Sequence, residues 1–204
     1  MRPEKEKLLR QAVNEFTVKS VKEIIKPQEE KFIQSMPKEY TLNSGMKILR
    51  EEISKGGRDG SAVIVVPVIS GEILAIVEPR VFTKKTVAVG FPAGYINEGE
   101  DPTQSAKREL REETGFEAKE LIELDSFYQD EGCSKALNRI YLALDCEKKF
   151  DQELDKDEYV TPIIFTFEEL LELEKRGYIS GSNSKLALAR IERYFKEKWY
   201  NEEF

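Results

Sequence analysis

Residues 94–116 read Gly94-Tyr-Ile-Asn-Glu-Gly-Glu100-Asp-Pro-Thr-Gln-Ser-Ala-Lys-Arg108-Glu109-Leu110-Arg-Glu112-Glu113-Thr-Gly115-Phe116. We expect a helix to begin at Asp101 and Pro102. An Asp side chain can accept from the free amides of a first turn, and proline lacks an amide hydrogen that this turn would leave unpaired. Gly115 ends the helix, since the residue after a helix often needs a positive φ, which glycine adopts without steric cost. The stretch therefore predicts a helix of about three to four turns.

Three carboxylates share one face of this predicted helix. Glu109, Glu112 and Glu113 stand at positions i, i+3 and i+4, which are neighbours on a helix surface. Adjacent anions repel and raise each other's pKa unless a cation lies between them, and ligand sets made only of oxygen favour hard ions such as Mg²⁺ or Mn²⁺. The spacing therefore predicts a divalent metal as cofactor.

Two further charged residues flank the carboxylates. We interpret Glu100 and Arg108 as an orienting pair that fixes where the ligand side chains point. The alternative is an ordinary solvated helix, the usual explanation of a Glu-rich stretch in a chain with 35% charged residues. The whole run fits Gly-x5-Glu-x7-Arg-Glu-U-x-Glu-Glu-x-Gly-U, where U is bulky and aliphatic. A chance match in a chain of this length has a probability on the order of one in a million.

The pattern resembles the Nudix box, the signature of the Nudix hydrolases, and only Phe116 departs from it, in a position that concerns packing. The resemblance implies that Glu109, Glu112 and Glu113 are metal ligands, with Glu112 also counted as catalytic and the Ala93 carbonyl as a further ligand. It also implies an α/β/α sandwich that hydrolyses a nucleoside diphosphate linked to another group.

Other segments resemble the ADP-ribose pyrophosphatase branch of this family. They are Glu78-Pro-Arg80, Phe91-Pro-Ala-Gly94 and Ile179-Ser-Gly-Ser-Asn-Ser-Lys-Leu-Ala-Leu188. The resemblance implies that Arg80 and Tyr128 contact the substrate, ADP-ribose or a related nucleotide sugar. The segment from Tyr128 to Ser134 lacks the two prolines often found in this branch, and Phe91 replaces a common glutamate. A dinucleotide or a CoA-type substrate therefore stays open.

The general base is expected in an acidic loop. The chain has no histidine, which excludes a Ser-His-Asp triad, histidine-bound zinc and imidazole acid-base catalysis. A mobile carboxylate remains, and residues 151–158 offer several. Glu158 is the first choice, because Asp157-Glu158-Tyr159-Val160 resembles the segment that supplies the base in the same branch. Glu153 is the second.

Composition limits the class of protein. The chain has 204 residues, 40% of them hydrophobic, and a net charge of −7. The length suits one moderate domain, and the charge argues against nonspecific nucleic-acid binding. No apolar stretch approaches the roughly 18 residues of a membrane helix. Cys133 and Cys146 fit no disulfide or zinc framework, so we expect free thiols in a soluble cytoplasmic protein that binds neither nucleic acid nor membrane.

Residues 1–58 are strongly charged and are interpreted as an N-terminal extension, with residues 59–204 as the hydrolase domain. Within this domain we expect a hairpin of strands 62–69 and 73–77, strands over 121–128 and 138–144, and a helix over 167–175 opened by a Thr166–Glu169 capping box. A last helix is expected from about residue 183. Strands interleaved with helices predict an α/β fold with a mixed sheet and helices on both faces.

The quaternary state and the class of function each leave an alternative. In the resembled branch the N-terminal segment commonly pairs two subunits, so a homodimer is expected, and the alternative is a monomer whose extension caps the sheet. A Nudix domain that senses a ligand without cleaving it is the alternative to an enzyme. The intact carboxylates Glu109, Glu112 and Glu113 favour the enzyme.

Overall fold

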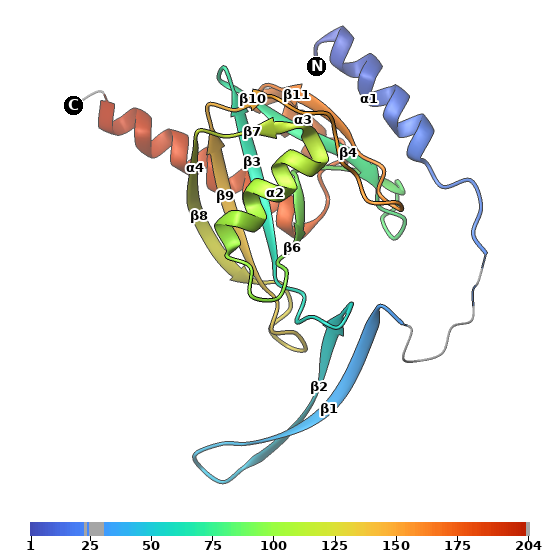
Figure 1. Cartoon of the computed structure of the whole chain (residues 1–204), viewed down its shortest axis with the longest axis vertical. Helices are drawn as coiled ribbons and strands as arrows, with labels where there is room; N and C mark the ends of the chain where they lie inside the picture. Colours follow the sequence, from blue (N-terminus) through green and yellow to red (C-terminus); the bar gives the residue numbers. More distant parts are fainter. Residues whose placement is uncertain (23, 25–30, 203–204) are drawn as a thin grey trace.

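The computed structural model describes residues 1–22, 24 and 31–202. The β-branched run between residues 62 and 79 forms the centre of a seven-stranded mixed sheet (Figure 1). The strand order is β11-β4-β3-β9-β8, with β5 paired to β4 and β6 paired to β3. The sheet is mixed because β3 and β9 run parallel while the other pairs are antiparallel. Its strands are β3 (Ala62–Ile69), β4 (Glu72–Pro79), β5 (Val87–Gly90), β6 (Ala93–Tyr95), β8 (Glu120–Tyr128), β9 (Leu137–Leu144) and β11 (Thr161–Phe165).

Four helices and two small strand pairs complete the described part of the chain. The helices are α1 (Pro3–Phe16), α2 (Pro102–Thr114), α3 (Phe167–Lys175) and α4 (Ser182–Glu202). The small pairs are β1 (Ile33–Thr41) with β2 (Lys47–Lys55), and β7 (Phe116–Glu117) with β10 (Glu147–Lys148). Among the described residues no helix combines the length and the apolar character that a membrane span requires.

Local sequence signals account for several of these elements. The predicted hairpin is confirmed as β3–β4, and its turn residues Ser70 and Gly71 have φ values of 51° and 82°, as a tight two-residue turn of the I′ type requires. The predicted capping box is also confirmed. The Thr166 side chain accepts from the Glu169 amide at 3.2 Å, and Glu169 accepts from the Thr166 amide at 3.0 Å.

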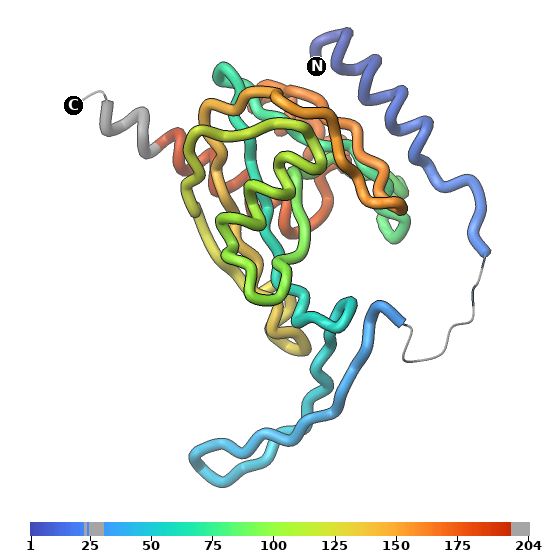
Figure 2. The backbone as a smooth tube through the Cα atoms, viewed as in Figure 1, coloured from blue at the N-terminus to red at the C-terminus, as the bar shows by residue number. Residues whose placement is uncertain are grey.

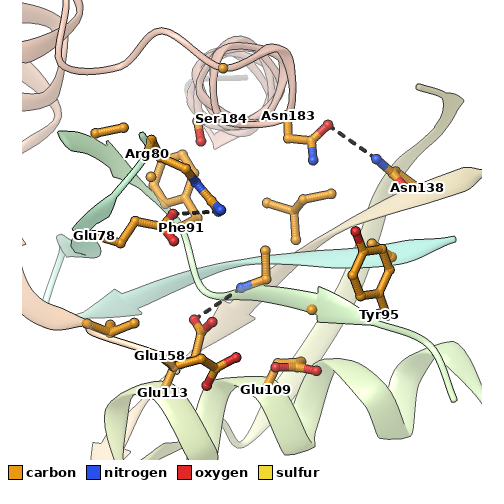
Figure 3. Close-up of a pocket in the computed structure, with 18 of the residues that line it drawn as sticks. Glu78, Arg80, Phe91, Tyr95, Glu109, Glu113, Asn138, Glu158, Asn183 and Ser184 are labelled. Carbon is orange, nitrogen blue, oxygen red and sulfur yellow. Dashed lines mark hydrogen bonds and ion pairs between the residues drawn. The ribbon is translucent and has the colours of Figure 1, made fainter. Parts of the chain in front are cut away.

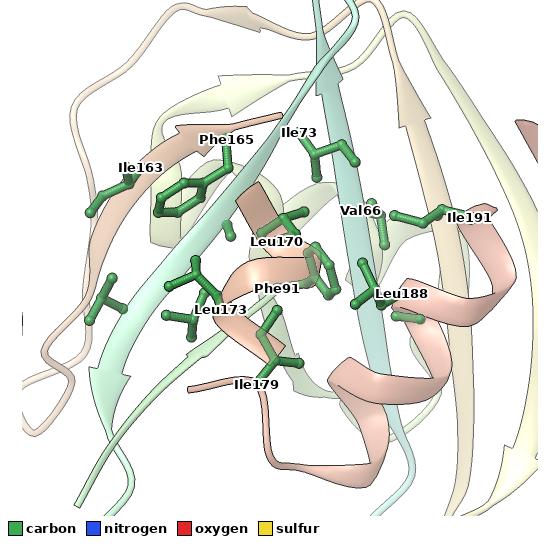
Figure 4. Close-up of a cluster of buried hydrophobic side chains, with 14 of the residues drawn as sticks. Val66, Ile73, Phe91, Ile163, Phe165, Leu170, Leu173, Ile179, Leu188 and Ile191 are labelled. Atoms are coloured by element: carbon green, nitrogen blue, oxygen red, sulfur yellow. The ribbon is translucent and has the colours of Figure 1, made fainter. Parts of the chain in front are cut away.

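Alternation along β3 separates two hydrophobic layers. Val63 and Val65 pack with Ala106 and Leu110 of α2 on one face of the sheet. The intervening residues of β3, such as Ile64, pack on the other face with α3 and α4, because successive side chains of a strand point to opposite sides of the sheet (Figure 4). The labelled members of this second layer include Val66, Ile73, Phe91, Leu170, Leu173, Leu188 and Ile191. The expected α/β/α sandwich is therefore confirmed.

The N-terminal extension has two parts with different surroundings. In α1, Leu9 and Ala12 are buried in the layer that α3 and α4 cover, so this helix belongs to the body of the domain. The β1–β2 hairpin instead stands away from the main sheet (Figure 2). The division of the chain at residue 58 stays a prediction.

Two ion pairs hold α1 against α3. Arg2 donates to both carboxylate oxygens of Glu169, from Nε at 3.1 Å and from Nη2 at 2.7 Å. Arg176 donates to both carboxylate oxygens of Glu6, at 2.7 and 3.1 Å. The Glu169 side chain is only 7% exposed, and its hydrogen bonds with Arg2 lower the pKa of Glu169 to about 2.

We expect Glu169→Gln to destabilise the fold at neutral pH by about 1–3 kcal/mol, the range for hydrogen bonds to charged groups. The pKa of Glu169 is depressed from 4.5 to about 2, so its contribution is complete above about pH 4.5 and is lost as the pH falls through that window. Urea unfolding of wild type and variant between pH 7 and pH 2 should show the difference in stability shrinking with acidity. Glu168→Gln, at the exposed neighbouring position, is the control and should stay within about 0.5 kcal/mol of wild type. A difference that is constant with pH would contradict this account.

Candidate active site

Helix α2 begins and ends where its sequence predicts. Asp101 has an extended backbone (φ −68°, ψ 133°), and its side chain accepts from the amides of Thr103 at 2.9 Å and Gln104 at 3.3 Å. Gly115 ends the helix with a φ of 76°. The side chains of Ala106 and Leu110 anchor the helix on the sheet, which leaves its carboxylate face turned towards a pocket.

Arg108 gathers the carboxylates of α2 and of the preceding turn. Its Nε and Nη2 donate to the two oxygens of Glu100, at 3.0 and 3.1 Å. Its Nη1 donates to Glu109 at 2.6 Å and to Glu112 at 3.0 Å, and Nη2 also reaches the Tyr95 carbonyl at 3.1 Å. The Arg108 guanidinium therefore links Glu100, its partner in the expected orienting pair, to Glu109 and Glu112, which are two of the expected metal ligands.

Burial and Arg108 shift the pKa values of these carboxyl groups in opposite directions. Burial raises the pKa of Glu109 to about 7, although Arg108 lowers it in part. Burial also raises the pKa of Glu113 well above its usual value, and the neighbouring Glu78 and Glu109 carboxylates raise it further. Hydrogen bonds from Arg108 instead lower the pKa of Glu100 to about 2. Glu113 has little compensation, since its Oε2 accepts from the Ala93 amide at 3.2 Å while its acidic neighbours repel it.

The donor set fits a hard divalent cation. The three carboxylates of α2 offer only oxygen, two of them are buried, and like charge raises the pKa of both buried groups. Within the described residues no three acidic groups already lie close enough together to chelate one ion. Arg108 explains this for Glu109 and Glu112, because its Nη1 lies between their oxygens. Binding an ion would therefore require these side chains to turn from Arg108.

Strand β6 passes so close to α2 that only glycine fits at one position. A Cβ on Gly94 would overlap the Glu109 carboxylate. The preceding residue, Ala93, presents its amide to Glu113, and its carbonyl belongs to the same segment of the pocket wall. The Phe91–Gly94 segment thus holds its backbone against the carboxylate face of α2 (Figure 3).

The carboxylates face a cavity of about 900 Å³, within the size range of small-molecule sites. Its lining includes the ends of β4, β5 and β6, the face of α2, the acidic loop and the start of α4. Among the described lining residues, eight are acidic and only four are basic. The acidic ones are Glu78, Glu109, Glu112, Glu113, Glu153, Asp155, Asp157 and Glu158, and the basic ones are Lys55, Arg58, Arg80 and Arg108.

Both candidate bases line this cavity. Glu158 is exposed and lies near Glu109 and Glu113, whose pKa values its charge raises (Figure 3). Glu153 instead forms an ion pair with Arg111 at 3.2 Å. The surroundings therefore favour Glu158 as the residue closer to the acidic centre of the pocket.

The root of the acidic loop is fastened to the end of α2. The Gly115 carbonyl accepts from the amides of Lys149 and Phe150, both at 3.0 Å, and the Glu112 carbonyl accepts from the Glu153 amide at 2.8 Å. A Cβ on Gly115 would overlap the Phe150 carbonyl oxygen. The helix and the loop therefore form one structural unit.

Arg80 lies on the opposite side of the pocket from α2. Its Nη2 forms an ion pair with Glu78 at 2.7 Å, and the Glu78 side chain is only 15% exposed (Figure 3). Burial raises the pKa of Glu78, while Arg80 lowers it in part. Arg80 is thus held over the cavity by a buried partner, in a position where its remaining donors can meet an anionic ligand.

The structure does not bring Tyr128 to this cavity. Tyr128 ends β8 with its side chain exposed, and the residue that lines the cavity is the next one, Gln129. The physical reason is the alternation of side chains along an extended chain, which places successive residues on opposite sides. The proposed contact between Tyr128 and a substrate therefore has no support in the geometry.

Sequence reasoning missed several polar residues of the pocket. Glu78 was seen only as part of a resembling segment, although a glutamate at the end of a buried strand is an unusual residue. A single asparagine in the apolar strand β9, Asn138, carried a similar signal. Asn183 and Ser184 were also seen only as part of a resembling segment, and polar residues are in any case ordinary at the start of a helix.

Comparisons with known proteins agree with this geometry. The family model described as the NUDIX domain matches residues 58–183. The chain is 30% identical over 136 residues to an ADP-ribose pyrophosphatase of Bacillus subtilis (strain 168), which covers 65% of this chain and 72% of that protein. It is 32% identical over 136 residues to a methanol dehydrogenase activator of Bacillus methanolicus, which covers 66% of this chain and 74% of the other. A crystal structure of an ADP compounds hydrolase has the same fold, with a TM-score of 0.68 and 20% identity over 81% of this chain and 92% of that one.

We expect Gly115→Ala to destabilise the protein by at least about 1–3 kcal/mol, because alanine is strained at a positive φ and its Cβ would meet the Phe150 carbonyl. Gly132→Ala is the matched control. Its φ is not positive and its nearest neighbour would lie 3.6 Å away, so we expect a change within about 0.5 kcal/mol. Chemical denaturation of both variants makes the comparison, and equal stabilities would refute this account of the junction.

Proposed function

The chain belongs to the NUDIX domain family, and we propose that this Nudix pyrophosphohydrolase cleaves the diphosphate linkage of ADP-ribose or a related nucleotide sugar. The products are a nucleoside monophosphate and a sugar phosphate. The observation that carries the proposal is the carboxylate face of α2, which Arg108 organises at the wall of a cavity large enough for such a ligand. The similarity to the ADP-ribose pyrophosphatase of Bacillus subtilis supports the choice of substrate.

The charge of the pocket supports Mg²⁺ or Mn²⁺ as the cofactor. Eight acidic residues against four basic ones would repel a diphosphate, which is itself an anion. We propose that Glu109, Glu112 and Glu113 hold the cation, with the Ala93 carbonyl as a further ligand. A divalent cation bound there would neutralise the phosphates and lower the pKa of water.

The side chains of the chain itself would divide the remaining tasks. Arg80, held by Glu78, would hydrogen-bond a phosphate oxygen from the side opposite α2. Glu158 would act as general base and accept a proton from the attacking water. The oxygen of this water joins one phosphorus as the bridging P–O bond breaks. Glu100 and Arg108 would orient the carboxylates of α2 without touching the substrate.

A panel of substrates tests the function. Purified protein would be assayed with ADP-ribose, other nucleotide sugars, dinucleotides and CoA, first with Mg²⁺ and then with Mn²⁺. We expect phosphate-ester products from ADP-ribose or a nucleotide sugar and no turnover once EDTA removes the metal. Preferred cleavage of a dinucleotide or CoA would keep the hydrolase and change its substrate, whereas binding without any product would establish the sensing domain instead.

Glu158→Gln should lower turnover by about 10²–10⁴-fold, the usual contribution of general-base catalysis, while metal affinity stays close to that of wild type. Asp151→Asn, at an exposed position of the same loop that is not among the residues lining the cavity, is the control and should stay within about threefold of wild type. If Glu158→Gln also stays within about threefold, Glu158 is not the base, and Glu153→Gln is the next variant to assay.

We propose that two copies of the chain associate through the β1–β2 hairpin. A two-stranded hairpin is marginally stable alone, and this one exposes several large apolar side chains, among them Ile33, Met36 and Leu49. At the base of the hairpin, the centroid of the Phe32 ring lies 6.0 Å from the centroid of the Tyr95 ring, and Tyr95 lines the pocket. The proposed interface would therefore lie beside the site.

Light scattering at micromolar protein should give the mass of a dimer. The double substitution Ile33→Lys and Leu49→Lys should shift this mass towards a monomer, because the pairing register places both side chains on one face of the hairpin and the charges would lie on that apolar face. Lys47→Ala, on the same hairpin, serves as the control and should leave the mass unchanged. A wild-type protein that is monomeric throughout this range would contradict the proposal.

We also propose a cytoplasmic location for the enzyme. The support is that Cys133 and Cys146 are both free in the structure, as a reducing compartment keeps thiols.

A further inference from the structure

The cavity has a second polar wall, which the proposed chemistry does not use. It faces the carboxylates of α2 and is built from β9 and the first turn of α4 (Figure 3). Three side chains supply most of its polar groups: Asn138, Asn183 and Ser184. All three are neutral, whereas the rest of the cavity lining is rich in charge.

Asn138 is a buried amide at the start of β9. Its residue is fully buried, its Nδ2 donates to Asn183 Oδ1 at 3.2 Å, and no hydrogen-bond partner is found for its Oδ1 within the described part of the chain. A buried polar group without a full set of partners is costly, so a folded chain seldom keeps one without a role. Because Asn138 is fully buried and its Nδ2 is bonded to Asn183, this role is exerted through Asn183.

The contact with Asn138 fixes how Asn183 faces the cavity. With Oδ1 of Asn183 turned to Asn138, the amide nitrogen of Asn183 is directed to the ligand space (Figure 3). Asn183 belongs to the first turn of α4, whose backbone amides have no carbonyl partner inside the helix. Ser184 adds a hydroxyl beside Gly90, where a Cβ would come within 3.0 Å of its Oγ. This wall therefore presents several neutral donors and one hydroxyl.

The character of this wall differs from that of the diphosphate side. In the view of Figure 3, Arg80 lies below Ser184 and to the left of Asn183, whereas Asn138 lies to the right of Asn183. The nearest charge on α4, Lys185, is engaged by Glu174 at 3.3 Å. Phosphate recognition favours arginine and lysine, whereas sugar hydroxyls, which both donate and accept, suit amides, hydroxyls and backbone amides.

We propose that this wall is a sugar subsite, in which Asn183 hydrogen-bonds ring hydroxyls of the ligand and Asn138 is the positioning residue that holds the Asn183 amide. The inference rests on the proposed function, since it assigns the part of a nucleotide sugar that lies away from the metal ligands. Two parts of such a ligand carry the same chemistry: the ribose of the nucleoside and the sugar beyond the diphosphate.

Binding of analogues that the enzyme cannot cleave tests the subsite. The ligands are the α,β-methylene analogues of ADP-ribose, ADP and 2′-deoxy-ADP, titrated by calorimetry in Mg²⁺. The pair ADP-ribose and ADP reports the sugar beyond the diphosphate, and the pair ADP and 2′-deoxy-ADP reports the nucleoside ribose. We expect wild type to prefer the ligand with the additional hydroxyls by roughly tenfold in one pair, which identifies the sugar.

Asn183→Ala should abolish that preference and leave the affinity for the poorer ligand of the pair unchanged. Asn138→Leu, which keeps the volume without the polar atoms, should do the same, since the Asn183 amide is then no longer held. Lys185→Ala, on the same helix, is the control and should keep the wild-type preference. Thermal unfolding accompanies each variant, and if Asn138→Leu does not fold, the partly exposed Asn183→Ala decides.

Three results would overturn the subsite. They are no preference by wild type in either pair, a preference that survives Asn183→Ala, and an equal loss of affinity for both members of a pair, which would indicate a diphosphate contact or a structural role. Failure of the proposed function is a separate result, because it is the absence of products from the cleavable nucleotide sugars and does not depend on these affinities.

Discussion

The site depends on one arginine that keeps several anions together. Like charges on one helix face repel, and in this chain the Arg108 guanidinium offsets that repulsion by donating to Glu100, Glu109 and Glu112. Glu113 lies outside this network, and burial together with the neighbouring carboxylates raises its pKa. The proposed cation would offset the repulsion that Arg108 leaves uncompensated at Glu113.

The sandwich separates stability from chemistry. One face of the sheet packs on α1, α3 and α4 through the larger hydrophobic layer, while α2 covers the other face with a smaller one and keeps its charged face free. The ends of several strands then surround the free face of α2, and the start of α4 closes the cavity from the far side (Figure 3). Each wall can therefore carry a different kind of ligand contact without disturbing the packed layers.

Local signals predicted the elements that local physics decides. The limits of α2, the β3–β4 turn and the capping box of α3 all follow from residues within a few positions of one another. Contacts between distant segments could not be found in this way. Asn138 meets Asn183 across 45 positions of sequence, and α1 packs into the body of the domain through Leu9 and Ala12, although its charged sequence suggested only an extension.

Within the candidate site, prediction succeeded where spacing along one helix sufficed. The geometry does not support a substrate contact for Tyr128, which was inferred only from a family resemblance. Tyr128 ends a strand, where a shift of one position changes the side of the sheet that a side chain faces.

The junction at Gly115 also fixes how long α2 can be. Each helical residue turns the chain by about 100°, so one inserted between Glu112 and Gly115 would rotate the Gly115 carbonyl relative to the Glu112 carbonyl, and the two could no longer both meet the loop amides that they bind. The carboxylates and the acidic loop would then lose their common register. A change in helix length that leaves the hydrophobic layers intact would thus still separate the two halves of the site.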